Sequence, residues 1–427
     1  MRLRDKSSPR LAAWPAGDIL WAPVAQDFTS RAMPSPAQAV RDGLAVMSDR
    51  IRPGDRVAVA VGSRGISSIV EVCQSLIGWL MSRGASPFIV PAMGSHGGGT
   101  AEGQVAVLES LGITEAAMGA PIMADMATVP AGTLGGGITV PTDKLAAAAD
   151  LVIPVARVKP HTDFRGKIES GPAKMLTIGL GHRDGAEAIH AVGLSRLSET
   201  IAEAGQLLIR VLHVPFCVAI VEDALDAAAI VEVVPSEALP SREPELLDLA
   251  RTWMPYLPVP ELDVLVIQEM GKDISGNGMD PNITGRFYDP RLTARTSVDR
   301  LAVLDLTRHT AGNATGIGMA DIVTSRLAEK IDWQQTYINE ITSGTPVGVR
   351  LPLVAIDDEE ALAIAVRTLG IPPRRLRLGW IQNTLRLSRL MVTEPVLGSV
   401  AGEVRVLARP EPISFTAGDL VPPMFPA

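Results

Sequence analysis

The sequence predicts an α/β fold made of two α/β domains with mainly parallel sheets and an active-site cleft between the domains. Three observations lead to this prediction. The chain has 427 residues, more than one ordinary hydrophobic core accommodates. Short aliphatic runs alternate with segments of helical periodicity. Aromatic residues make up only 4% of a chain rich in aliphatic residues and glycine, a mix typical of buried parallel strands.

The first strand–helix–strand unit opens with residues 56–61, a branched aliphatic run that Gly62 ends. A helix is expected over 67–83, because apolar residues recur there on one face. Residues 87–91 predict the next strand. Two parallel strands joined through a helix cross over in the right-handed sense.

The same alternation continues to the end of the N-terminal domain. A glycine-rich turn, a helix and two strands are expected at 94–99, 100–111, 151–155 and 214–221. Between 234 and 260 the chain carries six prolines around one short helix, which predicts a domain boundary. We therefore expect an N-terminal domain over 1–255 that carries the cofactor and the catalytic histidines. A C-terminal domain over 256–427 is expected to close over the substrate.

The C-terminal domain is expected to repeat the α/β pattern. Its predicted strands cover 263–268, 301–306 and 353–356. Its predicted helices cover 320–330 and the segment from Asp358 to just before Gly370. The last forty residues or so read as short strands and loops.

Composition excludes several classes of protein. The formal net charge is −8 and basic residues form no continuous run, so no nucleic acid is expected as a partner. No apolar window of membrane-spanning length occurs, and no apolar stretch follows the basic N-terminus, so neither a membrane span nor a signal peptide is expected. Cys73 and Cys217 lie in apolar segments, which predicts buried, reduced thiols and a cytoplasmic protein.

Histidines are the main functional signal. Four of the six lie within a stretch of 95 residues, and three of these follow strands in glycine- or proline-rich turns. Ligands of doubly wound sheets bind at such turns, at the carboxyl ends of the strands. The first turn, Gly94–Thr100, contains His96 and lets the backbone approach a ligand. It matches neither a Walker A loop nor the dinucleotide fingerprint.

The segment 158–190 is dense in glycine and polar residues, yet core elements bracket it. This predicts a ligand site, with a solvated crossover loop as the alternative. Lys174 lies between small residues and Met175-Leu176, so its stem is expected to be partly buried. A partly desolvated lysine can act as a nucleophile toward a carbonyl.

Together these residues resemble the lactate racemase family, whose members carry a nickel-pincer nucleotide. Gly171–Lys174, followed sixteen positions later by His190, resembles the family's turn in which a lysine is covalently joined to the cofactor and a histidine ligates nickel. His96 and His161 match the two catalytic histidines. Ser63-Arg64 resembles the arginine turn that holds the cofactor phosphate or the substrate.

The resemblance implies a nickel-dependent isomerase, a racemase or epimerase of a 2-hydroxy acid, that works by proton-coupled hydride transfer. Two bases are needed because the hydroxyl points to opposite sides in the two enantiomers, and histidine suits that role. The implied partners are a small 2-hydroxy acid and, transiently, the enzymes that make the cofactor. Pro172 in place of a glycine and a longer loop after His161 indicate a divergent branch. Lys272 and Trp333 are the nearest candidates for substrate contacts.

Two other functions stay open at this point. One is a metal-dependent hydrolase in which His96, His161 and His190 form a three-histidine site. The other is a non-catalytic protein that senses a nucleotide or sugar phosphate. Of the remaining histidines, we expect His182 to be a supporting loop residue and His213 to lie in the core. His309 is a minor candidate for the cleft.

Overall fold

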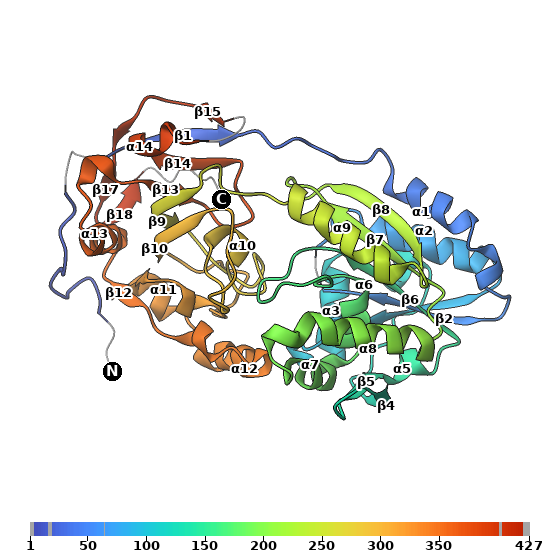
Figure 1. Cartoon of the computed structure of the whole chain (residues 1–427). Coiled ribbons are helices and arrows are strands. Elements are labelled where there is room, and N and C mark those ends of the chain that lie inside the picture. Colours follow the sequence, from blue (N-terminus) through green and yellow to red (C-terminus); the bar gives the residue numbers. More distant parts are fainter. Residues whose placement is uncertain (1–3, 16–18, 64, 401–403, 422–427) are drawn as a thin grey trace. The chain divides into compact units, whose positions relative to one another are not determined.

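The computed structural model describes residues 4–15, 19–63, 65–400 and 404–421 (Figure 1). The chain divides into two compact units, 29–254 and the combination of 1–28 with 255–427. The division between residues 254 and 255 lies within the proline-rich segment that predicted a domain boundary. The first 28 residues differ from our expectation, because they belong with the C-terminal unit. Strand β1 (Leu20–Gln26) explains this, since it pairs antiparallel with β14 (Arg389–Thr393).

The N-terminal unit is built on a five-stranded sheet in the order β3-β2-β6-β7-β8. These strands are β2 (Arg56–Val61), β3 (Ser86–Pro91), β6 (Leu151–Arg157), β7 (Phe216–Glu222) and β8 (Ala228–Pro235). The first four run parallel, and β8 is antiparallel to β7. The strands predicted over 56–61, 87–91 and 151–155 are confirmed, and β7 begins two residues later than predicted.

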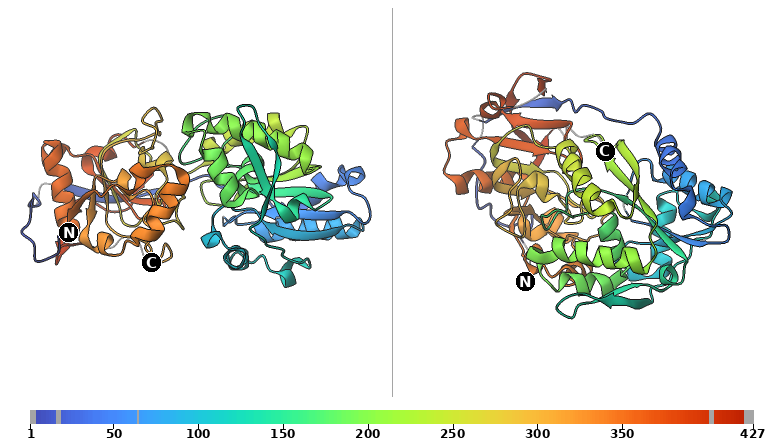
Figure 2. Two further views of the ribbon diagram at one scale, coloured as in Figure 1. Left: turned by 90° about the horizontal axis from the view of Figure 1, so that it is seen from below. Right: turned by 45° about the vertical axis from the view of Figure 1, so that its right-hand side comes forward.

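Helices cover both faces of this sheet (Figures 1 and 2). One face packs against α1 (Pro36–Ala45), α2 (Ile69–Ser82) and α3 (Ala101–Ser110). The other packs against α6 (Pro172–Lys174), a π-helix (Met175–Gly179), α7 (His182–His190), α8 (Leu197–Val211) and α9 (Leu239–Trp253). Alternate residues of β2 enter the two cores, so this strand is apolar on both sides, as in parallel sheets generally.

Smaller elements complete the N-terminal unit. They are α4 (Glu115–Met118), α5 (Lys144–Ala147) and the antiparallel pair β4 (Thr128–Thr133) and β5 (Thr139–Asp143). Cys73 and Cys217 are both buried and unpaired, as predicted. Within the described residues, no helix combines the length and apolarity that crossing a membrane requires.

The C-terminal unit contains a nine-stranded sheet, in the order β12-β11-β10-β9-β13-β14-β1-β15 with β16 also paired to β1. Its remaining strands are β9 (Glu261–Ile267), β10 (Ser297–Val303), β11 (Ile322–Thr324), β12 (Leu353–Ala355), β13 (Leu378–Ile381), β15 (Val404–Val406) and β16 (Glu411–Pro412). The part from β12 to β13 is parallel, and β14, β1 and β15 continue it antiparallel. Strands β17 (Ser414–Thr416) and β18 (Asp419–Val421) form a separate pair.

The helices of this unit are α10 (Pro281–Thr284), α11 (Ser325–Glu329), α12 (Trp333–Ser343), α13 (Asp358–Leu369) and α14 (Glu394–Leu397). Helix α13 begins and ends as predicted, with Asp357 as its N-cap and Gly370 at φ +66° after its last turn. The helix predicted over 320–330 is wrong in its first part. Residues 322–324 form β11, and the Thr324 hydroxyl caps the short α11 that follows.

Candidate active site

The site lies in the N-terminal unit, at the carboxyl edge of its parallel strands. Ser63 follows β2, His96 follows β3 and His161 follows β6. Because β2 lies between β3 and β6 and all three run parallel, these residues leave the sheet at the same edge. Ligands of open α/β sheets bind at this edge.

The imidazole of His96 is fixed by two contacts of Nδ1. This atom lies 2.8 Å from the carbonyl oxygen of Met93 and 3.1 Å from Oγ of Ser63. A carbonyl oxygen only accepts, so Nδ1 carries the proton and donates it to Met93. In the neutral ring Nε2 then keeps its lone pair, which is the state that a general base needs.

The turn that carries His96 is packed against the segment after Lys174. Gly97 has φ +65°, and a Cβ there would lie 2.6 Å from the backbone nitrogen of Gln104, so a side chain does not fit. The buried Gln104 side chain donates to the carbonyl of Gly94 at 2.8 Å. The N–H of Gly94 donates to the carbonyl of Gly179, in the π-helix, at 3.1 Å.

His161 and Lys174 meet directly, as the sequence predicted them to share one site. The distance from Nε2 of His161 to Nζ of Lys174 is 2.5 Å. The backbone N–H of Asp163 donates to Nδ1 of His161 at 3.1 Å, and the ring packs on Phe164 with 4.4 Å between centroids. Lys174 is the last residue of α6, directly before the π-helix, a feature frequent at functional sites.

The buried carboxyl group of Glu243 packs against the turn that carries Lys174. Glu243, on α9, accepts from the backbone N–H of Ala173 at 3.3 Å. A Cβ on Gly171 would lie 2.2 Å from Oε1 of Glu243, so the turn approaches this side chain as closely as glycine allows. Burial raises the pKa of Glu243 to about 8, although the Ala173 N–H acts in the opposite direction. The carboxyl group is therefore largely protonated at neutral pH.

His190 ends α7 with its Nδ1 buried and without a hydrogen-bond partner. Burial is the largest cause that lowers the pKa of His190 to about 4, and positive charge on Lys174, whenever its amine is protonated, acts in the same direction. The backbone carbonyl of Ala186 counteracts both. His190 is thus a neutral imidazole near Lys174, in which one ring nitrogen carries the proton and the other keeps a lone pair for a metal.

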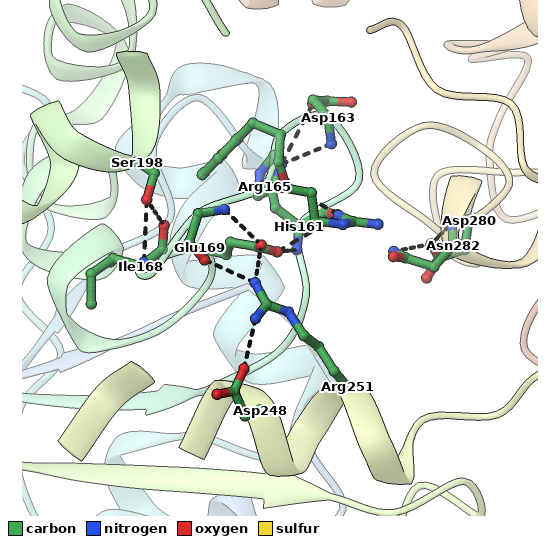
Figure 3. Close-up of polar contacts among 12 residues, drawn as sticks. His161, Asp163, Arg165, Ile168, Glu169, Ser198, Asp248, Arg251, Asp280 and Asn282 are labelled. Atoms are coloured by element: carbon green, nitrogen blue, oxygen red, sulfur yellow. Dashed lines mark hydrogen bonds and ion pairs between the residues drawn. The ribbon is translucent and has the colours of Figure 1, made fainter. Parts of the chain in front are cut away.

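The loop 159–170, which carries His161, encloses a buried carboxylate (Figure 3). Lys159 and Ser170 close the loop through two backbone hydrogen bonds of 3.1 and 3.2 Å. Inside it, the fully buried Glu169 accepts from the N–H of His161 at 2.6 Å and from the N–H of Gly166 at 3.1 Å. The carboxylate therefore fixes the backbone on both sides of the His161–Asp163 turn.

Arg251 of α9 completes this loop from outside (Figure 3). Its Nη2 lies 2.5 Å from Oε1 of Glu169 and 2.8 Å from the carbonyl of Gly166, while Nη1 reaches Asp248 at 2.7 Å. Sequence reasoning missed Glu169, Arg251 and Glu243. Neighbouring residues in the sequence give no signal for them, because their roles arise from packing between α9 and two loops far away in sequence.

Other histidines have different surroundings. His182 is buried at the start of α7, with φ +50°, and its Nε2 lies 2.8 Å from Oδ2 of Asp143 on β5. His213 is exposed at φ +47°, so the prediction that it lies in the core is wrong. The chain turns sharply between α8 and β7 at this residue. His309 is exposed in the C-terminal unit.

The sequence also predicted Arg64, Lys272 and Trp333 as site residues. Arg64 falls outside the described residues. Lys272 belongs to the C-terminal unit, and its Nζ donates to the carbonyl of Gly276 at 2.7 Å. Trp333 is the first residue of α12, with its ring 5.5 Å from that of Tyr337. Their role toward a substrate stays a prediction.

The three-histidine metal site that we considered as an alternative is not formed. Within the described part of the chain, no group of three His, Cys, Asp or Glu side chains is placed to hold a metal ion. His161 directs its Nε2 to Lys174 instead of toward the other two imidazoles of that set.

Comparison with known proteins gives a likeness of fold only. No protein-family model matches the chain, and no curated protein matches it. Among solved structures, the chain is similar to the lactate racemase apoprotein from Thermoanaerobacterium thermosaccharolyticum. The two share 13% sequence identity with a TM-score of 0.49, over 86% of this chain and 99% of that one. A likeness of this size assigns no role to any residue.

Proposed function

We propose that this chain is a racemase or epimerase of a 2-hydroxy acid, and that it uses a nickel-pincer nucleotide tethered to Lys174. The observation that carries the proposal is the 2.5 Å contact between Lys174 and His161, with the neutral His190 nearby. The sequence motifs that resemble the lactate racemase family contain these same residues. A shared site for the three is what that resemblance requires.

The residues present fit such a cofactor. His190 offers a buried, unpartnered ring nitrogen on a neutral imidazole, and imidazole is a suitable ligand for nickel. Lys174 would hold the nucleotide through its amine. Arg64, outside the described residues, is proposed to bind its phosphate. The chemistry that such a group supplies when bound is the reversible acceptance of a hydride from the substrate carbon.

The two catalytic histidines are in complementary protonation states. His96 has its proton on Nδ1, so Nε2 can take the proton of the substrate hydroxyl. His161 accepts an N–H at Nδ1, so its proton is on Nε2 and can be given to the oxygen of the planar keto acid. One residue removes a proton while the other returns one, and the roles are exchanged for the other enantiomer.

Intact mass tests the proposal. The chain is expressed with nickel and the enzymes that make the cofactor, and is compared with Lys174→Ala and with Lys167→Ala, a change at an exposed lysine of the same segment. We expect a nucleotide-sized mass increment in the wild type and in Lys167→Ala, and none in Lys174→Ala. The loaded protein should interconvert the enantiomers of a 2-hydroxy acid.

Other outcomes distinguish the alternatives. Nucleotide that is bound without a covalent increment, and that still binds to Lys174→Ala, would favour a sensor of nucleotides or sugar phosphates. Hydrolytic activity with metal alone would favour a hydrolase. Either result would contradict the proposed function.

A further inference from the structure

We propose that the loop 159–170 holds Lys174 as an uncharged amine through the proton on Nε2 of His161, and so makes it the reactive lysine of the chain. Its natural target is the activated carboxyl carbon of a ligand. This inference deepens the proposed function, because covalent tethering needs a nucleophilic amine, and it rests on that function for its biological meaning. Its test requires neither nickel nor nucleotide.

The hydrogen bonds of His161 determine where its proton lies. Two groups of Asp163 face Nδ1: its N–H at 3.1 Å and, beyond hydrogen-bond distance, its carboxylate Oδ2 at 3.8 Å. The N–H is the nearer and can only donate, so Nδ1 carries a lone pair. A neutral imidazole with a lone pair on Nδ1 has its one proton on Nε2. The 2.5 Å contact with Lys174 is then a bond from Nε2–H to Nζ. An ammonium group has no lone pair to accept it, so Nζ is an uncharged amine.

The surrounding loop keeps Asp163 in the position that sets this tautomer. Glu169 binds the main chain at His161 and at Gly166, on either side of Asp163. Arg165 donates to the carbonyl oxygen of His161 at 2.7 Å, which ties the loop back on itself. Glu169 is therefore a positioning residue that acts on Lys174 through His161.

The covalent step is an ordinary acyl transfer. When the ligand displaces Nε2–H, the lone pair of Nζ attacks the carbonyl carbon of an activated carboxyl group and a C–N bond forms. The bond to the leaving group breaks, and the leaving group departs with its electron pair. Nζ releases one proton to water, and the product is an amide on Lys174.

The rate of acetylation measures this reactivity directly. The full chain, purified without cofactor, is treated with a limiting amount of N-hydroxysuccinimidyl acetate at pH 7.4, and its seven lysines are followed by peptide mass spectrometry. An ordinary lysine has about one amine in a thousand unprotonated at this pH. We expect Lys174 to react at least about tenfold faster than the exposed Lys167 of the same segment, even though its partial burial slows access. Equal rates would overturn the proposal.

Matched variants test the part played by His161. His161→Asn is too short to reach Lys174, and we expect Lys174 to fall to the rate of Lys167. His213→Asn makes the same change at the exposed histidine of the same unit, and should leave the rate as in the wild type. Glu169→Gln should lower the rate of Lys174 several-fold with Lys167 unaffected. A fast Lys174 in folded His161→Asn would contradict the role assigned to His161.

A measurement on the wild type tests the inference even if the variants fail to fold. Nitrogen-15 chemical shifts of labelled histidine distinguish the two tautomers, and we expect His161 to carry its proton on Nε2. A proton on Nδ1 would overturn the inference. A reactive Lys174 that gains no nucleotide in cells would contradict only the proposed function, whereas a nucleotide adduct with an ordinary Lys174 rate would contradict only this inference.

Discussion

Two ionisable side chains near Lys174 are held neutral by burial, although burial shifts them in opposite directions. The pKa of His190 falls to about 4 and that of Glu243 rises to about 8, with desolvation as the largest cause in both. Neither side chain therefore carries much charge at neutral pH. Burial of these two uncharged side chains lowers the local dielectric, which strengthens the hydrogen bond between Glu243 and the Lys174 turn.

The lowered pKa of His190 predicts a loss of stability in mild acid. Between pH 6.5 and about 4 the unfolded chain binds a proton at this residue while the folded chain does not. The contribution of His190 is thus fully present above pH 6.5 and is lost as the pH falls through 4, by about 3 kcal/mol at most. Urea unfolding at pH 7 and pH 4.5 measures this difference. The difference in unfolding free energy between the two pH values should be smaller in His190→Gln and unchanged in His213→Asn. The same difference in the wild type and both variants would contradict the prediction.

Glu243 predicts the opposite dependence in alkaline solution. Its folded pKa lies above the unfolded value of 4.5, so its contribution is fully present below pH 4.5 and is lost as the pH rises through about 8. The loss is on the order of 5 kcal/mol at most. Glu243→Gln keeps an acceptor for the N–H of Ala173 but cannot ionise. The drop in Tm between pH 6 and pH 9 should therefore be smaller in this variant, and an unchanged drop would count against a buried, protonated Glu243.

At the scale of elements, the turn before Lys174 depends on the absence of a side chain at Gly171. A methyl group there would lie 2.2 Å from Oε1 of Glu243, whose side chain is almost completely buried. We expect Gly171→Ala to cost about 1–3 kcal/mol of unfolding free energy and to lower the reactivity of Lys174. Gly78, inside α2, has open space around it, so Gly78→Ala should stabilise the chain by about 0.5–1 kcal/mol. Urea midpoints compare the two, and a neutral Gly171→Ala would refute this packing argument.

Elements whose sequence pattern is local were predictable, and those defined by distant partners were not. The strands β2 and β3 and the helix α2 follow from periodicity and glycine stops. Helix α9 is longer than the short helix expected. Pro240 lies in its first turn, where the missing N–H costs little, and the helix continues through Pro244 in its interior. Strand β1 was missed, since its pairing partner lies more than 350 residues away.

The candidate site divides in the same way. His96, His161, Lys174 and His190 stand out because their residue types are unusual for their local sequence. The residues that hold them do not, because a glutamate such as Glu169 reads as an ordinary surface residue until the loop around it is known. Periodicity predicts which segments form the core. It does not predict which carboxylate a closed loop will surround.

At the scale of the whole molecule, the N-terminal segment is part of the C-terminal unit. Strand β1 lies between β14 and β15, and Trp21 stacks on Trp380 of β13 with 5.2 Å between ring centroids and 8° between planes. Both rings are almost completely buried. The chain therefore begins in one unit, forms the other and then returns to complete the first.

This connectivity predicts different behaviour for the two halves when they are produced separately. Residues 29–254 contain every strand of their own sheet and the helices that cover it, so this fragment should unfold cooperatively by itself. Residues 255–427 lack β1, which leaves β14 and β15 without their shared partner and Trp380 without its stacked ring, so we expect no cooperative transition in circular dichroism. Joining 1–28 to the end of 255–427 through a flexible linker should restore it, and the same fusion with Trp21→Ala should be less stable by about 3–5 kcal/mol. If 255–427 alone unfolds at the midpoint of the full chain, β1 is an accessory edge and not the strand that completes the sheet.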